Sequence, residues 1–153
     1  VIRELNRLKI CTDLSHLNDK SFFGAIERAD YPIASHSNSR EICPAPRNLT
    51  DEQLKLIGEK NGLIGLCFYP KFLGGNAFEK IYENICRLGN LGLENNIAIG
   101  SDFDGADMSD ELSDISRVPD LYTYLEKRGI SAGTLKKIFY ENAQNYFDKL
   151  SGI

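Results

Sequence analysis

The sequence contains only two histidines, one methionine and no tryptophan in 153 residues. It has four cysteines, but no two of them form a C-x-x-C pair, so a cysteine-based zinc site is not predicted. No hydrophobic run approaches the roughly 20 residues that a membrane-spanning helix needs. The formal net charge of −4 also argues against a nucleic-acid-binding surface, which needs an excess of positive charge.

The remaining composition is that of a globular protein. Hydrophobic residues make up 42% and charged residues 26% of the sequence, so we expect residues 1–153 to form a single domain with a buried core. Cys11 and Cys67 lie in apolar, strand-like runs, and buried reduced thiols favour a cytoplasmic location. Residues 1–8 already have the spacing of an amphipathic helix, without a signal-peptide pattern, so we expect this chain to be a piece of a longer one.

Hydrophobic periodicity predicts four strand–helix units after this first helix. A capping-box pattern, Thr50 with Gln53, marks one helix start, whereas Pro70 is expected to end a strand and begin a loop. Strands that alternate with helices indicate a parallel α/β sheet, either a small doubly wound sheet or half of a TIM-like (β/α)8 barrel. We expect strands at 9–16, 32–36, 63–69 and 97–101, helices at 21–29, 50–60, 77–91, 119–128 and 131–150, and loops at 71–75 and 106–118.

The residues with catalytic or metal-binding chemistry stand at the ends of these strands. His16 and His36, the only histidines, end the first two strands, Tyr69 ends the third, and Asp102 follows the fourth. Because the carboxyl ends of parallel strands share one edge of a sheet, we expect a metal-ligand or acid–base set there. We expect one of Asp102 and Asp104 to serve the site and the other to cap or brace the loop. The alternatives are structural histidines and a plain Asp-Gly turn.

Arg47 lies in the proline-containing loop that follows the second strand. A well-positioned arginine binds a carboxylate or a phosphate through two parallel hydrogen bonds. Considered alone, Arg47 could equally be a solvated surface arginine.

Several segments together resemble one known family in their order and spacing. They are Asp13-Leu-Ser-His16, Ser35-His36-Ser37, Pro46-Arg47-Asn48-Leu49-Thr50-Asp51, Phe68-Tyr69 and Gly100-Ser-Asp102-Phe-Asp-Gly105. The chain is similar, nearly end to end, to the renal (membrane) dipeptidases, which are zinc dipeptidases. The resemblance implies an amidohydrolase-type TIM-like barrel with two zinc ions, in which a metal-bridging hydroxide hydrolyses the peptide bond of a dipeptide.

The resemblance also implies a role for each candidate residue. His16 and His36 correspond to the two ligands of one zinc ion, and Arg47 to the arginine that holds the terminal carboxylate of the substrate. Asp102 corresponds to the aspartate beside the substrate amino group, which assists proton transfer.

The sequence departs from the family by what it lacks. It has no counterpart of the family's His-x-Asp pair, of the glutamate that bridges the two metals, or of the further histidine that stabilises the oxyanion. We therefore expect the chain to be the C-terminal half of such a dipeptidase, inactive or weakly active alone. We also expect it to associate with itself or with the missing N-terminal half.

Two other functions are compatible with the pattern. A non-catalytic α/β module would act by self-association or partner binding, would keep both histidines as structural residues and would need no zinc. A metal-independent barrel lyase or phosphate-binding enzyme is disfavoured, because no strand ends in a lysine suited to a Schiff base and no glycine-rich phosphate loop is present.

Overall fold

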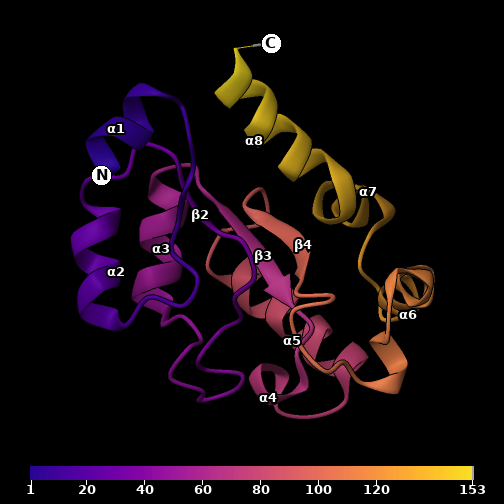
Figure 1. Cartoon of the computed structure of the whole chain (residues 1–153). Coiled ribbons are helices and arrows are strands. Elements are labelled where there is room, and N and C mark those ends of the chain that lie inside the picture. The colour runs from indigo at the N-terminus through magenta and orange to yellow at the C-terminus, as the bar shows by residue number, and fades with distance from the viewer. Residues whose placement is uncertain (153) are drawn as a thin grey trace.

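The computed structural model describes residues 1–152, which form one parallel sheet with helices packed around it (Figure 1). The four strands lie in the order β1-β2-β3-β4, and each is parallel to the next. A doubly wound sheet reverses its strand order, whereas a barrel adds each strand beside the previous one. The sheet is therefore half of a (β/α)8 barrel. The strands are β1 (Thr12–Asp13), β2 (Pro32–Ala34), β3 (Leu63–Cys67) and β4 (Ile97–Ser101).

Helices occupy the segments between the strands, as the periodicity predicted. The last predicted helix is continuous from Ala132 to Ser151 but contains one π-helical turn, Lys137–Glu141. The helices are α1 (Ile2–Arg7), α2 (Asp19–Ile26), α3 (Asp51–Glu59), α4 (Pro70–Leu73), α5 (Ala77–Asn90), α6 (Val118–Lys127), α7 (Ala132–Lys136) and α8 (Asn142–Ser151).

Local sequence signals explain several of these boundaries. Thr50 and Gln53 form both hydrogen bonds of the capping box that starts α3. The Asn18 side chain accepts a hydrogen bond from the Ser21 N–H at the start of α2. Asn61 follows α3 with a positive φ of 52°, as expected for the residue that ends a helix. All five residues of β3 are buried, which fits a strand covered on both faces.

The lengths of the first three predicted strands and two predicted loops were wrong in detail. The first three strands are shorter than expected. At the end of β2, the Asp13 carboxylate takes the N–H of Ser35 that a longer β1–β2 ladder would use. Pro70 begins the short helix α4 instead of a loop, since the first turn of a helix does not need the N–H that proline lacks. The expected loop at 106–118 contains two 3-10 turns, Asp110–Leu112 and Ile115–Arg117.

Helix α8 lies across the amino ends of the strands (Figure 1). The Tyr146 hydroxyl donates to the Pro32 carbonyl of β2, and the Asn142 amide donates to the Ile97 carbonyl of β4. The candidate residues stand at the opposite, carboxyl ends of the strands, beside an open cavity. None of the helices within residues 1–152 is long and apolar enough to span a bilayer.

We predict that Asn38→Ala lowers the free energy of unfolding by about 3 kcal/mol, measured by urea denaturation. Asn38 is fully buried, and its side chain bonds both the N–H and the carbonyl of Cys67. Removing it leaves two buried backbone groups unpaired, at roughly 1–3 kcal/mol each. The exposed Asn145 provides the control, since Asn145→Ala should change stability by less than about 0.5 kcal/mol. Equal effects of the two variants would contradict the prediction.

Candidate metal and substrate site

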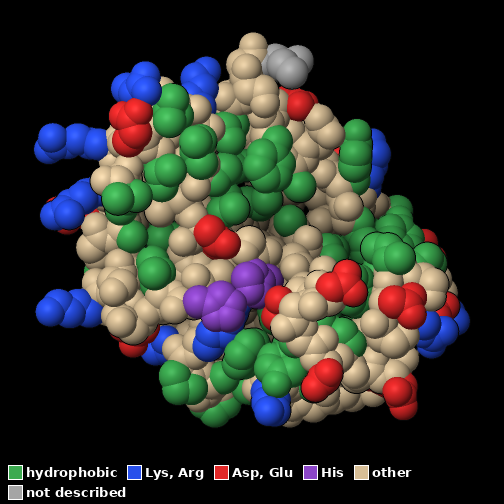
Figure 2. All heavy atoms as spheres, in the orientation of Figure 1, with side chains coloured by type: hydrophobic (Ala, Val, Ile, Leu, Met, Phe, Trp, Pro, Cys, Tyr) green, Lys and Arg blue, Asp and Glu red, His purple; other side chains and the backbone are tan. Residues whose placement is uncertain are grey.

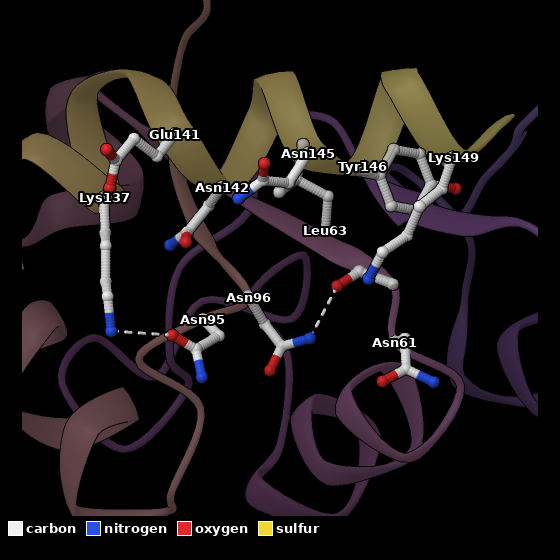
Figure 3. Close-up of a pocket in the computed structure, with 11 residues that line it drawn as sticks. Asn61, Leu63, Asn95, Asn96, Lys137, Glu141, Asn142, Asn145, Tyr146 and Lys149 are labelled. Carbon is white, nitrogen blue, oxygen red and sulfur yellow. Dashed lines mark hydrogen bonds between the residues drawn. The ribbon is translucent and has the colours of Figure 1, made fainter. Parts of the chain in front are cut away.

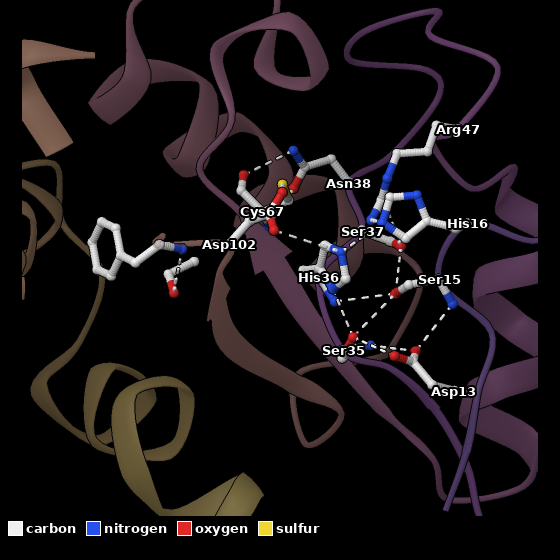
Figure 4. A network of polar contacts seen from close by, with 12 residues as sticks. Asp13, Ser15, His16, Ser35, His36, Ser37, Asn38, Arg47, Cys67 and Asp102 are labelled. Atoms are coloured by element: carbon white, nitrogen blue, oxygen red, sulfur yellow. Dashed lines mark hydrogen bonds and ion pairs between the residues drawn. The ribbon is translucent and has the colours of Figure 1, made fainter. Parts of the chain in front are cut away.

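The four predicted site residues meet at the carboxyl edge of the sheet (Figure 4). The Nε2 atoms of His16 and His36 lie 2.9 Å apart. Arg47 Nη2 lies 3.2 Å from His16 Nε2, and Asp102 Oδ1 lies 3.8 Å from His36 Nε2. Residues separated by as many as 86 positions in the sequence thus form one cluster of two imidazoles, one guanidinium and one carboxylate.

Sharp backbone turns directly after the strands aim these side chains. His16 has a φ of 67° and Asp102 a φ of 76°, both in the left-handed region that non-glycine residues seldom adopt. Strand β4 ends at Ser101, and Asp102 and Asp104 follow it two positions apart. Both aspartates line the same open cavity, so neither is set aside to brace the loop away from the site.

Behind His36 lies a set of polar side chains that the sequence analysis did not single out as site residues. Ser35 Oγ stands 2.6 Å from His36 Nδ1 and donates a hydrogen bond of 2.5 Å to Asp13 Oδ2. Ser15 Oγ accepts from the His36 N–H. Burial raises the pKa of Asp13, but the hydrogen bonds from Ser35 and Ser15 outweigh this effect and hold the pKa below its ordinary value.

Burial and the nearby positive charge of Arg47 lower the pKa of His36. The neutral imidazole is therefore favoured near neutral pH, and the neutral ring is the form that binds metal ions.

Arg47 is held in place by contacts on several sides. Its Nη1 atom donates to Ser37 Oγ over 3.0 Å, and its guanidinium carbon lies 4.9 Å from the centre of the Phe72 ring. The neighbouring Asn48 side chain donates to the carbonyls of Cys43 and Phe72, which ties the arginine loop to α4. Burial lowers the pKa of Arg47, and a guanidinium remains charged in proteins nevertheless. Its Nε–H is buried and finds no acceptor among residues 1–152.

An open cavity of about 520 Å³ adjoins the cluster and is lined by Tyr69, Phe72, Asp102, Asp104 and Asp107, among others. In Figure 2 both histidine side chains reach the surface, with acidic side chains beside them. Tyr69 was among the strand-end candidates, whereas Phe72 was missed because α4 was expected to be a loop. The cavity therefore has two aromatic side chains and several carboxylates in its wall, together with the imidazole of His16.

A second cavity, of about 390 Å³, lies beneath α8 at the other end of the sheet (Figure 3). Its polar groups mostly serve the fold. Asn96 donates to the Gly62 carbonyl, Asn142 to the Ile97 carbonyl, and Lys137 to the Asn95 side chain. None of the four predicted site residues lines this cavity. We therefore interpret it as a gap in the packing between α8 and the strands, and not as a binding site.

Within residues 1–152, no three histidine, cysteine, aspartate or glutamate side chains stand close enough together to bind a metal ion by themselves. The two histidines nevertheless have the geometry of a ligand pair. The Arg47 N–H donates to His16 Nε2, so this nitrogen keeps a lone pair. His36 Nε2 lies 2.9 Å from this atom, so the two ring nitrogens are close enough for one ion to contact both.

Comparison with known proteins identified relatives along the whole chain. The family model of the membrane dipeptidases, peptidase family M19, matches residues 1–151. An uncharacterised protein from the pqqA 5′ region of Klebsiella pneumoniae is 37% identical over 150 residues, which cover 93% of this chain and 55% of that protein.

Two solved structures are also similar to the chain. The structure of a metallopeptidase described as dipeptidase AC has a TM-score of 0.93 and 33% identity, over 99% of this chain and 47% of its own. A metallopeptidase from Rhodobacter sphaeroides, liganded with a phosphinate mimic of the dipeptide L-Ala-D-Ala, has a TM-score of 0.92 and 33% identity. The match covers 97% of this chain and 45% of that one. The chain thus spans about half the length of these relatives.

The cysteines differ in exposure, and this difference predicts their order of alkylation. Burial raises the pKa of the Cys67 thiol to about 11, and this thiol donates to Asp102 Oδ2. Because only the thiolate reacts, Cys67 should resist iodoacetamide at about pH 8 and become reactive only as the pH approaches its own pKa. Cys11, which is less buried than expected, and Cys86 should react first in peptide mass spectra. Labelling of Cys67 as fast as Cys86 in the folded chain would contradict this.

Proposed function

Because the chain belongs to the membrane dipeptidase family, peptidase family M19, we propose that it contributes part of the active site of a zinc-dependent dipeptidase. The observation that carries the proposal is the meeting of His16, His36, Arg47 and Asp102 at one edge of the sheet. Since the chain spans about half the length of its relatives, the activity belongs to a complete site, to which this chain supplies some of the groups.

In this proposal His16 and His36 bind one of two zinc ions through their Nε2 atoms. When bound, zinc lowers the pKa of a coordinated water and polarises the scissile carbonyl. Catalytic zinc normally has three protein ligands, and this chain supplies two of them. The neutral form of His36, favoured by its lowered pKa, suits this role.

Arg47 is proposed to bind the terminal carboxylate of a dipeptide. A phosphinate mimic of a dipeptide is bound by the similar Rhodobacter sphaeroides enzyme, which supports a dipeptide as the substrate class. The contacts with Ser37 and Phe72 restrict the guanidinium to one plane, which a bidentate carboxylate contact requires. Its orphaned Nε–H adds a donor that still needs an acceptor.

Asp102 is proposed to bind the free amino group of the dipeptide and to assist proton transfer. Its Oδ2 atom accepts from the Cys67 thiol, and its Oδ1 atom is directed toward His36. The same carboxylate lines the cavity together with Phe72 and with His16, to which Arg47 donates. A substrate in the cavity would therefore contact Asp102 and approach Arg47 past His16.

A second candidate is a non-catalytic half-barrel module in which both histidines are structural. The absence of a third metal-binding side chain beside them, within residues 1–152, favours it. The two proposals differ in zinc binding, since only the dipeptidase needs the ion.

We also propose that the chain self-associates or pairs with the other half of a barrel. β1 and β4 are the outer strands of the sheet, and each leaves one edge without a strand partner. Such open edges favour pairing with another chain.

Sedimentation velocity should therefore show species larger than a monomer at about 100 μM, a concentration within the range at which exposed strand edges associate. A monomeric, zinc-saturated and fully active preparation would contradict this prediction.

The dipeptidase proposal is tested by hydrolysis of dipeptides with zinc supplied, at chain concentrations that allow pairing. We expect weak turnover, and we expect Arg47→Ala to lower kcat/KM by about 100-fold, because a charged hydrogen-bonded pair contributes roughly 2–5 kcal/mol. A dipeptide amide, which lacks the carboxylate, should lose little from the same substitution. Arg117→Ala is the matched control, since Arg117 pairs with Asp120 on α6 away from the site. Turnover unaffected by Arg47→Ala would overturn the assignment of Arg47.

A further inference from the structure

We propose that Asp13 is a positioning residue of the metal site, which acts through Ser35 to hold His36 in the tautomer that leaves Nε2 without a proton. The three side chains form a linear series of contacts (Figure 4). Asp13 Oδ2 is 2.5 Å from Ser35 Oγ, which is 2.6 Å from His36 Nδ1. We call this series the Asp13 relay. The relay is a property of the chain itself, whereas its effect on metal binding rests on the proposed function.

The number of available protons determines the direction of each hydrogen bond. An ionised carboxylate only accepts, so the single hydroxyl proton of Ser35 points to Asp13. Ser35 Oγ can then only accept from the imidazole, and the ring proton must be on Nδ1. The neutral ring of His36 therefore keeps a lone pair on Nε2. This lone pair faces His16 Nε2, which lies 2.9 Å away and already accepts from Arg47, so the two nitrogens have no proton to share and are left for a cation to bridge.

Ser35 has one other acceptor within reach, and it is a weaker one. Ser15 Oγ lies 3.5 Å away, at the limit of a hydrogen bond, whereas the carboxylate oxygen lies at 2.5 Å and carries charge. Ser15 Oγ already accepts from the backbone N–H of His36. The proton of Ser35 therefore stays with Asp13.

The fold prevents the Asp13 carboxylate from turning. Its Oδ1 atom accepts from the backbone N–H groups of Ser15 and Ser35, at 3.0 Å each. Asp13 ends β1 and pairs in register with Ile33 of β2, so Ser35 lies just beyond the last paired residues. Only Oδ2 is left to receive the hydroxyl group.

His16 has no such relay in its contacts. Its Nε2 atom accepts directly from Arg47, so the guanidinium must move away from this nitrogen before a metal ion can bind there. The two histidines thus differ in their hydrogen-bond partners, because only His36 is contacted through Nδ1 by Ser35. His16 therefore provides an internal reference for measurements on His36.

Asp13→Asn tests the relay because it reverses the direction of the hydrogen bonds without changing the shape of the side chain. The amide oxygen must take the Oδ1 position, where two backbone N–H groups donate, so the amide NH2 faces Ser35. The Ser35 hydroxyl then turns to donate to His36 Nδ1. The imidazole takes the tautomer with the proton on Nε2, which no longer presents a lone pair to a metal ion.

The measurement is the nitrogen chemical shift of the two imidazoles in metal-free, ¹⁵N-histidine-labelled chain at about pH 8, above the usual imidazole pKa. The chain has only two histidines, so a His36→Gln spectrum assigns both. We expect the Nδ1–H tautomer of His36 in the unaltered chain and the Nε2–H tautomer in Asp13→Asn, with His16 unchanged. Zinc affinity, measured by titration calorimetry, should fall by about 10–100-fold.

Two further variants separate the relay from a general effect on folding. Ser35→Ala removes the relay and should give a mixture of His36 tautomers. Ser37→Ala is the matched control, because it removes a buried hydroxyl from the same network that contacts Ser15 and Arg47 but not His36. It should leave the His36 tautomer as it is.

The outcomes for the relay and for the proposed function are distinguishable. A His36 ring that carries its proton on Nε2 in the unaltered chain, or a tautomer that Asp13→Asn does not change, would overturn the relay whatever the zinc affinity. A tautomer switch in a chain that binds no zinc would support the relay and count against the metal site.

Discussion

The structure depends above all on the parallel pairing of β1 with β2. The register joins Asp13 to Ile33, and His16 and His36 each stand three residues beyond this pair. Two parallel strands end on the same side of a sheet. Because each histidine lies the same number of residues beyond the paired Asp13 and Ile33, the two rings come to lie side by side. A shift of one residue would turn one ring to the other face of the sheet and separate the two Nε2 atoms.

The arginine loop depends on a different kind of constraint, namely buried polar groups that must be paired. Asn38 takes both backbone groups of Cys67, Asn48 bonds two carbonyls, and Asn84 accepts from the Ser39 N–H at 2.8 Å. All three side chains are fully buried, so losing one of these bonds would leave a polar group without a partner or water. The loop is therefore confined to a single conformation, and Arg47 is confined with it.

The sheet and the candidate site each contain only part of what a closed barrel and a complete metal site contain. The described sheet has two outer strands where a closed barrel has none, and no third histidine, cysteine, aspartate or glutamate within residues 1–152 completes a metal-binding group with the two histidines. Both properties agree with a chain that spans about half the length of its relatives. Helix α8, in contrast, already covers the amino ends of the strands. The covered ends of the strands and the incomplete site therefore lie at opposite ends of the sheet.

The sequence by itself determined the features that depend on neighbouring residues. Periodicity and capping predicted β4 at its observed bounds, the start of α3 at Thr50, and the place of His16, His36 and Asp102 after strand ends. Such signals are local, because a cap or a helix face involves residues only a few positions apart.

Only the tertiary structure decided the contacts between distant segments. The lengths of β1 and β2, the role of Asp13 and Ser35 behind His36, and the Phe72 ring beneath Arg47 could not be predicted, because they depend on side chains 22 or more residues apart. Whether two such side chains meet is set by strand register and by the turns that end each strand. Those are properties of the folded sheet and not of any one segment.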